Sequence, residues 1–364
     1  MTTTENVSFF LGANTPEGFY SLFSELYSPE DGWRLYILKG GPGTGKSTLM
    51  KRIAAAADKR GLFTERIYCS SDPHSLDAVI IPSLKISIAD GTPPHTLEPK
   101  YPGVCEKLVD PGLFRDDRLL SEHREAIIET AKENSFYHKK CVDFLLAALS
   151  CRNDTASVVI PSMKINSLHK FSEKLSEKLL TAVSDAPVKM KKRIISAVTP
   201  EGITDFSGTL GALSEKTVLL YDNFGCAASV ILKFLSLRAA ERGTEGYCCY
   251  DFMNPVSSPV ALVLPSLNLS FLRVKAKPSE EREADLSVNC MRFYDSTVLS
   301  RHKNRLAFNS RSENEMISGA AQCLIKAKAT HDRLEKYYIG AMDFDRMSRY
   351  TELLIDEIFS DESR

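Results

Sequence analysis

Two copies of one sequence pattern follow each other along the chain, and this repeat constrains the fold more than any other feature. The tetrapeptide Thr-Pro-Glu-Gly at residues 15–18 returns intact at residues 199–202, an offset of 184. Further matches keep the same order at similar offsets: residues 47–51 with 229–233, 82–84 with 265–267, and 171–173 with 350–352. One short match can arise by chance, but an ordered series indicates duplication, so we interpret the chain as a duplicated domain.

The join between the copies is predicted near residues 184–192, which gives one domain at residues 1–187 and a second at 188–364. The join begins with Ser184, Asp185, Ala186 and Pro187 and continues into a basic run, Lys189, Lys191, Lys192 and Arg193. A basic run can be a nucleic-acid contact or a solvated linker. Because no aromatic residues are interleaved with these cations, we favour the solvated linker.

Within the first copy the hydrophobic pattern alternates between strands and a helix. Four short apolar runs are typical of buried strands: residues 35–38, 66–69, 78–81 and 85–88. A helix is predicted from about residue 46 to 60, with Gly61 as its stop, and apolar residues later recur at helical spacing. The pattern predicts an α/β fold of two tandem domains, each a parallel sheet with flanking helices and a helical C-terminal part.

Composition excludes several classes of protein. Hydrophobic residues make up 43% of the chain and charged residues 26%, which is typical of globular domains. Lys and Arg number 46 against 47 Asp and Glu, so no overall charge favours nucleic acid or an anionic membrane. The longest apolar runs, such as residues 144–149, are too short to span a bilayer, and nine cysteines lie without metal-ligand spacing. We therefore expect a reduced, cytoplasmic protein with no membrane partner.

The clearest chemical motif is a glycine-rich loop that fits the pattern G-x-x-x-x-G-K-[ST] in full. It comprises Gly40, Gly41, Pro42, Gly43, Thr44, Gly45, Lys46, Ser47 and Thr48. A predicted strand precedes it and a predicted helix follows, as a phosphate-binding loop requires. The glycines let backbone N–H groups approach phosphate oxygens, Lys46 would carry charge to the β- and γ-phosphates, and Ser47 is the expected Mg²⁺ ligand. The motif predicts binding of a nucleoside triphosphate with Mg²⁺, and we expect ATP.

A second Mg²⁺ ligand should be a carboxylate at the end of a buried strand. Asp90 is the best candidate, and Asp72 and Asp77 are its rivals. The residue after Asp90 is glycine, so the glutamate that polarises water in many ATPases is missing at that place. His95, which follows closely, is either a catalytic residue or an ordinary loop histidine.

The second copy acts as an internal control, because it keeps the fold anchors and loses the phosphate ligands. At the positions of Gly40, Gly45, Lys46 and Ser47 it has Asp222, Ala227, Ala228 and Ser229. Asp90 is replaced by Arg273 and His95 by Pro278. Loss of Asp90 and His95 together with the lysine favours a site role for both. The second copy is therefore predicted to be a degenerate repeat that binds no triphosphate in this manner.

These motifs together resemble bacterial tandem P-loop proteins that are described as ATPases or as related to nucleotide kinases. The resemblance rests on residues 10–18, the loop at 40–48, residues 69–82 and residues 90–95, and it covers the whole chain. It implies two P-loop NTPase-like domains and nucleotide binding by the first. Relatives of this type can carry a second P-loop in the C-terminal copy, and this chain departs from that pattern.

Three functions fit the sequence. The first is a Mg²⁺-dependent ATPase, in which Lys46, Asp90 and His95 are the catalytic candidates and the second copy is a pseudo-NTPase. The second is a phosphotransferase acting on a nucleotide or small molecule, for which residues 115–118 (Arg-Asp-Asp-Arg) could form a lid, although a solvated helix start is the alternative reading. The third is a non-catalytic ATP-sensing switch with a protein partner.

Overall fold

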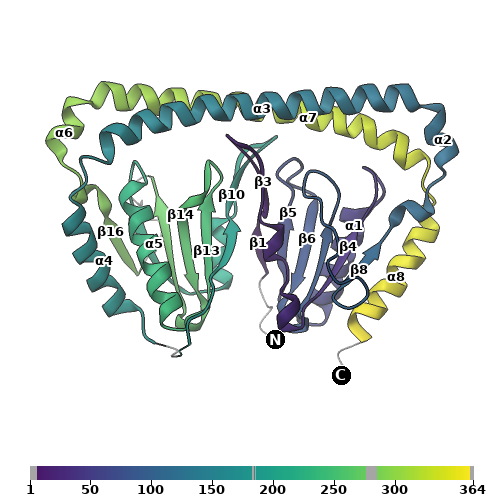
Figure 1. Ribbon diagram of the computed structural model, residues 1–364, viewed down its shortest axis with the longest axis horizontal. Coiled ribbons are helices and arrows are strands. Elements are labelled where there is room, and N and C mark those ends of the chain that lie inside the picture. Colours follow the sequence, from purple (N-terminus) through teal and green to yellow (C-terminus); the bar gives the residue numbers. More distant parts are fainter. Residues whose placement is uncertain (1–5, 183, 185, 276–284, 361–364) are drawn as a thin grey trace.

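The computed structural model describes residues 6–182, 184, 186–275 and 285–360, and its two halves share one topology (Figure 1). Asp185 and Pro278 lie outside these residues. The first sheet has the order β1(Val7–Phe9), β5(Glu65–Tyr68), β6(Leu76–Ile81), β7(Ile86–Asp90), β4(Arg34–Leu38), β8(Glu106–Val109). The second has the order β9(Lys191–Ile194), β13(Tyr247–Asp251), β14(Asn254–Leu264), β15(Leu269–Val274), β12(Lys216–Tyr221), β16(Leu286–Asn289). This repeated strand order accounts for the ordered sequence matches.

The repeated Thr-Pro-Glu-Gly tetrapeptides form the turns of two small hairpins. These are β2(Gly12–Thr15) with β3(Gly18–Ser21), and β10(Ser196–Thr199) with β11(Gly202–Asp205). In the first, the Thr15 hydroxyl donates to the Gly18 carbonyl at 2.8 Å, and in the second the Thr199 hydroxyl donates to the Gly202 carbonyl at 3.1 Å. Both glycines have positive φ, +111° and +97°, which side chains disfavour. The turn geometry thus explains why this tetrapeptide is the best-preserved match.

The sheets are mixed, and the prediction of a uniformly parallel sheet is wrong for one strand in each half. β6 runs antiparallel to both β5 and β7, and β14 runs antiparallel to β13 and β15. A parallel neighbour needs a crossover of a dozen or more residues, whereas β6 and β7 are joined only by a 3-10 turn, Pro82–Leu84, and Lys85. The other strands of each sheet run parallel to one another.

The helices are α1(Lys46–Lys59), α2(Asp117–Glu122), α3(Arg124–Val159), α4(Ile165–Leu179), α5(Cys226–Glu241), α6(Ser296–Arg301), α7(Lys303–Gly340) and α8(Phe344–Ser360). α1 matches the predicted helix, and Gly61, with φ +70°, follows its end as predicted. The two longest helices, α3 and α7, lie side by side and together span both halves (Figure 1). None of the helices in the described ranges has an apolar stretch that could cross a bilayer.

Each half gives its last helix to the other half. α4 follows the first sheet in sequence but packs against α5, where Leu168 and Leu175 share an apolar core with Ile231. α8 follows the second sheet but packs against α1, where Met347 and Leu354 share a core with the first half. Both helices are amphipathic, so each apolar face must be buried for the helix to be stable. The helical C-terminal parts therefore exchange, which the sequence did not predict.

Backbone hydrogen bonds close this exchange at both ends of the helix pair. Asp116 N–H donates to the Ala341 carbonyl and Asp343 N–H donates to the Phe114 carbonyl, each at 2.8 Å. The second half repeats the arrangement, with Lys164 N–H on Phe293 at 2.7 Å and Asp295 N–H on Ser162 at 2.8 Å. In both places the turn between the long and last helices of one half joins the segment before the short helix of the other.

The basic run at the predicted join is not a solvated linker beyond Lys189. Residues 191–194 form β9, and Arg193 is only 1% exposed. Its guanidinium donates to the carboxylate of Glu65, itself fully buried, at 2.9 and 2.7 Å. The Tyr247 hydroxyl donates to the second oxygen of Glu65 at 2.8 Å. Arg193 is therefore a buried cation that links the two sheets, because its carboxylate partner lies on β5 of the first half.

The charged segment at residues 115–118 is the start of a helix. The Asp116 side chain accepts from Arg118 N–H at 2.9 Å, which caps α2, and Arg115 pairs with Asp117 at 2.7 Å. Such capping satisfies backbone donors at a helix start. All nine cysteines are free thiols in this structure.

The buried pair between the halves gives a prediction about stability. Arg193→Met leaves the Glu65 carboxylate buried without its cation, and we expect unfolding free energy to fall by about 3–5 kcal/mol. Adding Glu65→Gln removes that charge and should restore much of the loss, because Tyr247 can still donate to the amide oxygen. Chemical denaturation of the two single variants and the double variant measures the coupling. If the losses in unfolding free energy of the two single variants simply add up in the double variant, Arg193 and Glu65 do not stabilise each other and the prediction is wrong.

Candidate functional site

The glycine-rich loop lies between β4 and α1, at the carboxyl end of the first sheet. Gly43 and Gly45 have φ values of +67° and +87°, so both positions use backbone conformations that side chains disfavour. Gly45 precedes the first turn of α1, and the Thr44 hydroxyl donates to the Gly41 carbonyl at 2.8 Å. The loop thus wraps around the N-terminus of α1, where unpaired N–H groups and the helix dipole favour an anion.

Lys46 is folded back onto its own loop. Its ammonium donates to the carbonyls of Gly40 and Gly41, each at 2.8 Å, and lies 3.5 Å from a carboxylate oxygen of Asp90. Its side chain is only 10% exposed. Asp90 ends β7, which pairs with β4 in the sheet, so the strand order places this carboxylate beside the loop. The loop lysine and the strand-end carboxylate of Asp90 therefore lie in one place.

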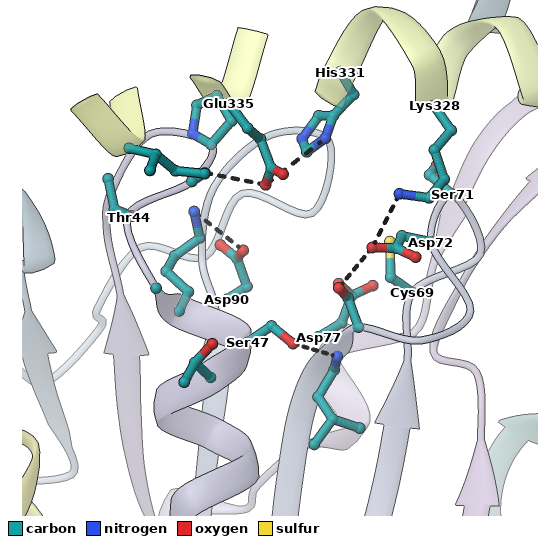
Figure 2. Close-up of a pocket in the computed structure, with 18 of the residues that line it drawn as sticks. Thr44, Ser47, Cys69, Ser71, Asp72, Asp77, Asp90, Lys328, His331 and Glu335 are labelled. Carbon is teal, nitrogen blue, oxygen red and sulfur yellow. Dashed lines mark hydrogen bonds and ion pairs between the residues drawn. The ribbon is translucent and has the colours of Figure 1, made fainter. Parts of the chain in front are cut away.

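The long helix α7 of the second half covers this loop. Gly43 N–H donates to the Glu335 carboxylate at 3.1 Å, and Figure 2 shows Glu335 reaching from α7 towards the loop. A Cβ atom at Gly43 would lie 2.9 Å from the Glu335 carbonyl oxygen, and one at Gly41 would lie 2.5 Å from the Tyr338 ring. These glycines are therefore needed for close packing of α7, besides their backbone role in the loop.

A cavity of about 410 Å³ opens between the loop and α7 (Figure 2). Three strand-associated carboxylates line it, Asp72, Asp77 and Asp90, so both rivals and the favoured candidate meet in one place. Ser47 also lines it, and its hydroxyl accepts from Leu76 N–H at 3.0 Å. Hydroxyl and carboxylate oxygens are the hard donors that Mg²⁺ prefers. Among the described residues, one buried oxygen of Asp77 has no hydrogen-bond partner.

Asp77 lies in an environment that disfavours its charged form. Burial, together with the nearby charge of Asp90, raises the pKa of Asp77 to about 6, against the opposing effects of His95 and Lys46. Asp72 differs: although burial raises its pKa, the Ser75 hydrogen bond and the Lys328 charge lower it overall. The pKa of Asp77 is therefore raised above the ordinary value for aspartate, and the pKa of Asp72 is lowered below it.

His95 lies next to Asp77 but is not among the residues that line the cavity. Its Nε2 is 3.7 Å from an Asp77 carboxylate oxygen, and its ring stacks on Phe23 with centroids 4.5 Å apart. Phe19 also contacts the ring, at 5.3 Å between centroids. Any effect of His95 on the cavity must therefore act through Asp77, and His95 is a positioning residue in this arrangement.

The sequence did not indicate the three polar residues of α7 that line the cavity, which are Lys328, His331 and Glu335. Lys328 lies 3.6 Å from Asp72, and His331 lies 3.9 Å from Glu335. With Asp332, His331 and Glu335 form a group whose possible metal-binding atoms lie within 4.8 Å of one another. Glu335 and Asp332 are already bonded, to Gly43 and Lys328 respectively. No local pattern could have found these residues, because the helix exchange alone brings α7 here.

The equivalent loop of the second half holds an anion of its own. The fully buried Asp222 carboxylate accepts from Phe224 N–H at 3.1 Å, Ala228 N–H at 2.9 Å and the Tyr294 hydroxyl at 2.9 Å. The Ser229 hydroxyl donates to the Pro259 carbonyl at 3.0 Å. Ala227 N–H donates to the Tyr294 hydroxyl at 2.8 Å, so two donors at the N-terminus of α5, those of Ala227 and Ala228, are satisfied internally.

No protein-family model matches this chain, and no curated protein or solved structure matches it either. The resemblance to tandem P-loop proteins therefore rests on the sequence motifs alone.

The raised pKa of Asp77 predicts a pH-dependent stability. Because the folded state binds this proton more tightly than the unfolded state, the associated stability is present at low pH and is lost as pH rises through about 6. Asp77→Asn removes that loss, so its unfolding free energy relative to wild type should increase between pH 4 and 8 by about 3 kcal/mol.

Asp72→Asn is the matched control, because its lowered pKa predicts the opposite trend. Urea denaturation at several pH values measures both variants. Parallel pH profiles for wild type and Asp77→Asn would contradict the assignment.

Proposed function

We propose that the first half binds Mg·ATP at the glycine-rich loop and hydrolyses it. The observation that carries this proposal is the meeting of Lys46, Ser47 and Asp90 in one cavity at the N-terminus of α1. A glycine-rich turn that arose by chance is not expected to have a lysine and a strand-end carboxylate beside the same helix start. A lysine, a hydroxyl and a carboxylate at a helix start are the groups that a triphosphate with its cation requires.

The charges of this cavity favour a nucleotide that carries its own cation. Four carboxylates and three lysines line the cavity: Asp72, Asp77, Asp90 and Glu335, with Lys46, Lys51 and Lys328. A bare triphosphate would meet an excess of negative charge. Ser47 and Asp90 are the oxygen donors that would hold Mg²⁺, and the bound ion would neutralise charge on the β- and γ-phosphates.

Binding requires two rearrangements of this chain's own residues. The Lys46 ammonium must leave the Gly40 and Gly41 carbonyls to reach phosphate. Glu335 must leave Gly43 N–H, because phosphate oxygen and carboxylate oxygen need the same donor. Asp77, with a pKa of about 6, is our candidate for accepting a proton from the attacking water, since a base is most effective near the working pH.

An ATP-sensing switch is the second candidate, and α7 is the observation that favours it. α7 contacts the loop at Gly41 and Gly43 and continues along both halves beside α3. Displacing it would carry a signal across the molecule. The phosphotransferase alternative gains less support, because Arg115 and Arg118, its proposed lid residues, do not line the loop cavity.

The experiment that tests the function combines ATP binding and phosphate release with Mg²⁺. We expect one triphosphate per chain by equilibrium dialysis, and Lys46→Ala should abolish turnover without loss of folding. The repeat offers a matched pair: Ser47→Ala should depress activity, whereas Ser229→Ala at the equivalent position should change neither affinity nor rate.

The outcomes separate the candidates. Tight binding with negligible phosphate release selects the switch, and release only with an added acceptor selects the phosphotransferase. Normal hydrolysis by Lys46→Ala, or two triphosphates per chain, would remove the proposal.

Glu335 gives a further prediction. Glu335→Gln removes a negative charge from the phosphate position while the amide oxygen can still accept from Gly43 N–H. We expect ATP to bind about 3- to 10-fold more tightly, equivalent to ~0.7–1.4 kcal/mol. Isothermal titration calorimetry measures the change, and the exposed Glu315→Gln on the same helix is the control. Unchanged or weaker affinity in Glu335→Gln would show that the carboxylate does not compete with phosphate.

A further inference from the structure

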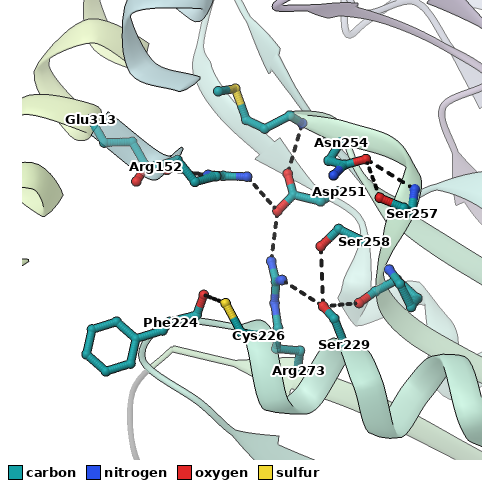
Figure 3. Close-up of polar contacts among 12 residues, drawn as sticks. Arg152, Phe224, Cys226, Ser229, Asp251, Asn254, Ser257, Ser258, Arg273 and Glu313 are labelled. Carbon is teal, nitrogen blue, oxygen red and sulfur yellow. Dashed lines mark hydrogen bonds and ion pairs between the residues drawn. The ribbon is translucent and has the colours of Figure 1, made fainter. Parts of the chain in front are cut away.

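A second and larger cavity lies in the second half, at the place equivalent to the loop cavity of the first. Its volume is about 970 Å³, near the upper end of the usual range for small-molecule sites. Residues 223–226 of the degenerate loop line one side, and Arg152 of α3 reaches in from the first half (Figure 3). Helix exchange thus builds this cavity from both halves, as it does the first.

The two cavities differ in charge. Four cationic side chains and two carboxylates line the second: Arg152, Arg273, Lys275 and Lys303, with Asp251 and Glu313. The excess is positive here, whereas carboxylates outnumber lysines in the first cavity. A ligand of the second cavity should therefore be an anion that arrives without a metal ion.

Two guanidiniums are fixed in the wall by one buried carboxylate. Asp251 accepts from Arg152 at 3.1 Å and from Arg273 at 2.9 Å, as Figure 3 shows. Arg273 makes one other hydrogen bond among the described residues, a long one of 3.5 Å to the Ser229 hydroxyl. A guanidinium has five N–H donors, so Arg273 keeps donors for a ligand. Because Asp251 holds both groups in place, little side-chain freedom is lost on binding.

The remaining wall suits an organic group. Apolar side chains contribute much of it: Leu149, Ile160, Phe224, Met291, Leu299 and Leu306. The ring of Phe224 offers a flat surface on which a planar group can stack. At the N-terminus of α5, Ala228 N–H already donates to Asp222 and Ala227 N–H to the Tyr294 hydroxyl, so arginine rather than these amides must recognise the anion.

We propose that this cavity binds a nucleoside monophosphate, or a phosphomonoester of similar size with a planar organic part, without Mg²⁺. The phosphate lies against Arg273 and Lys303, and the planar group lies against Phe224. A phosphomonoester carries nearly two negative charges at neutral pH, which matches the excess of two cations. The proposal does not depend on ATP hydrolysis by the first half.

The test is calorimetric titration with AMP, GMP, CMP and UMP in EDTA. At least one should bind, and the affinity should be unchanged in Lys46→Ala, which disables the first cavity. The nucleoside of the best ligand and inorganic phosphate, titrated separately, should each bind far more weakly than the whole nucleotide.

Variants of the cavity locate the site. Arg273→Gln should weaken binding by about 10- to 100-fold, the range expected for charged hydrogen bonds. Lys303→Gln changes an exposed side chain and should weaken binding about 3-fold or more. The control Lys233→Gln, at an exposed position of α5 that does not line the cavity, should leave binding unchanged. If no monophosphate binds in EDTA, or if Arg273→Gln and Lys303→Gln both bind normally, the proposal is wrong.

Discussion

The burial of α4 and α8 on the opposite halves is the constraint on which the rest of the structure depends. Each is an amphipathic helix whose apolar face must leave water, and each finds its partner helix, α5 or α1, across the molecule. Since only residues 341–343 separate α7 from α8, docking of α8 on α1 fixes the end of α7 over the glycine-rich loop. The same geometry fixes the end of α3 over the degenerate loop. Neither candidate site is complete without the other half.

The two loops occupy equivalent positions but differ in how firmly a carboxylate is held against them. In the first half the carboxylate is Glu335, a partly exposed side chain that comes from α7 and accepts one hydrogen bond from the loop. In the second it is Asp222, part of the loop's own entry, fully buried and held by backbone N–H groups and the Tyr294 hydroxyl. Under the proposed function, an incoming phosphate would displace the first by moving one side chain. Displacing the second would expose a buried network that the core of the second half requires.

The two cavities also differ in the charge of the side chains that line them. Carboxylates predominate beside the intact loop, where the proposed triphosphate would need a cation, and arginines and lysines predominate beside the degenerate loop. Duplication followed by this divergence would give one chain two unlike anion sites joined by α3 and α7. The buried Arg193–Glu65 pair and a shared apolar core hold the two sheets together beneath those helices.

Local sequence determined the loop, the strand and helix on either side of it, the stop at Gly61 and the repeat, because each depends on neighbouring residues and on hydrophobic periodicity. It also named Asp72, Asp77 and Asp90, which line one cavity because Asp72 follows β5, Asp77 lies at the start of the antiparallel β6 and Asp90 ends β7, all at one edge of the sheet. Only the tertiary structure decided the rest. The direction of β6 follows from short connections, the burial of Arg193 depends on Glu65 in another sheet, and Glu335 reaches Gly43 across 292 positions of sequence. Contacts between residues so far apart in sequence produce no pattern of hydrophobic periodicity. They depend on which surface buries the apolar face of each helix.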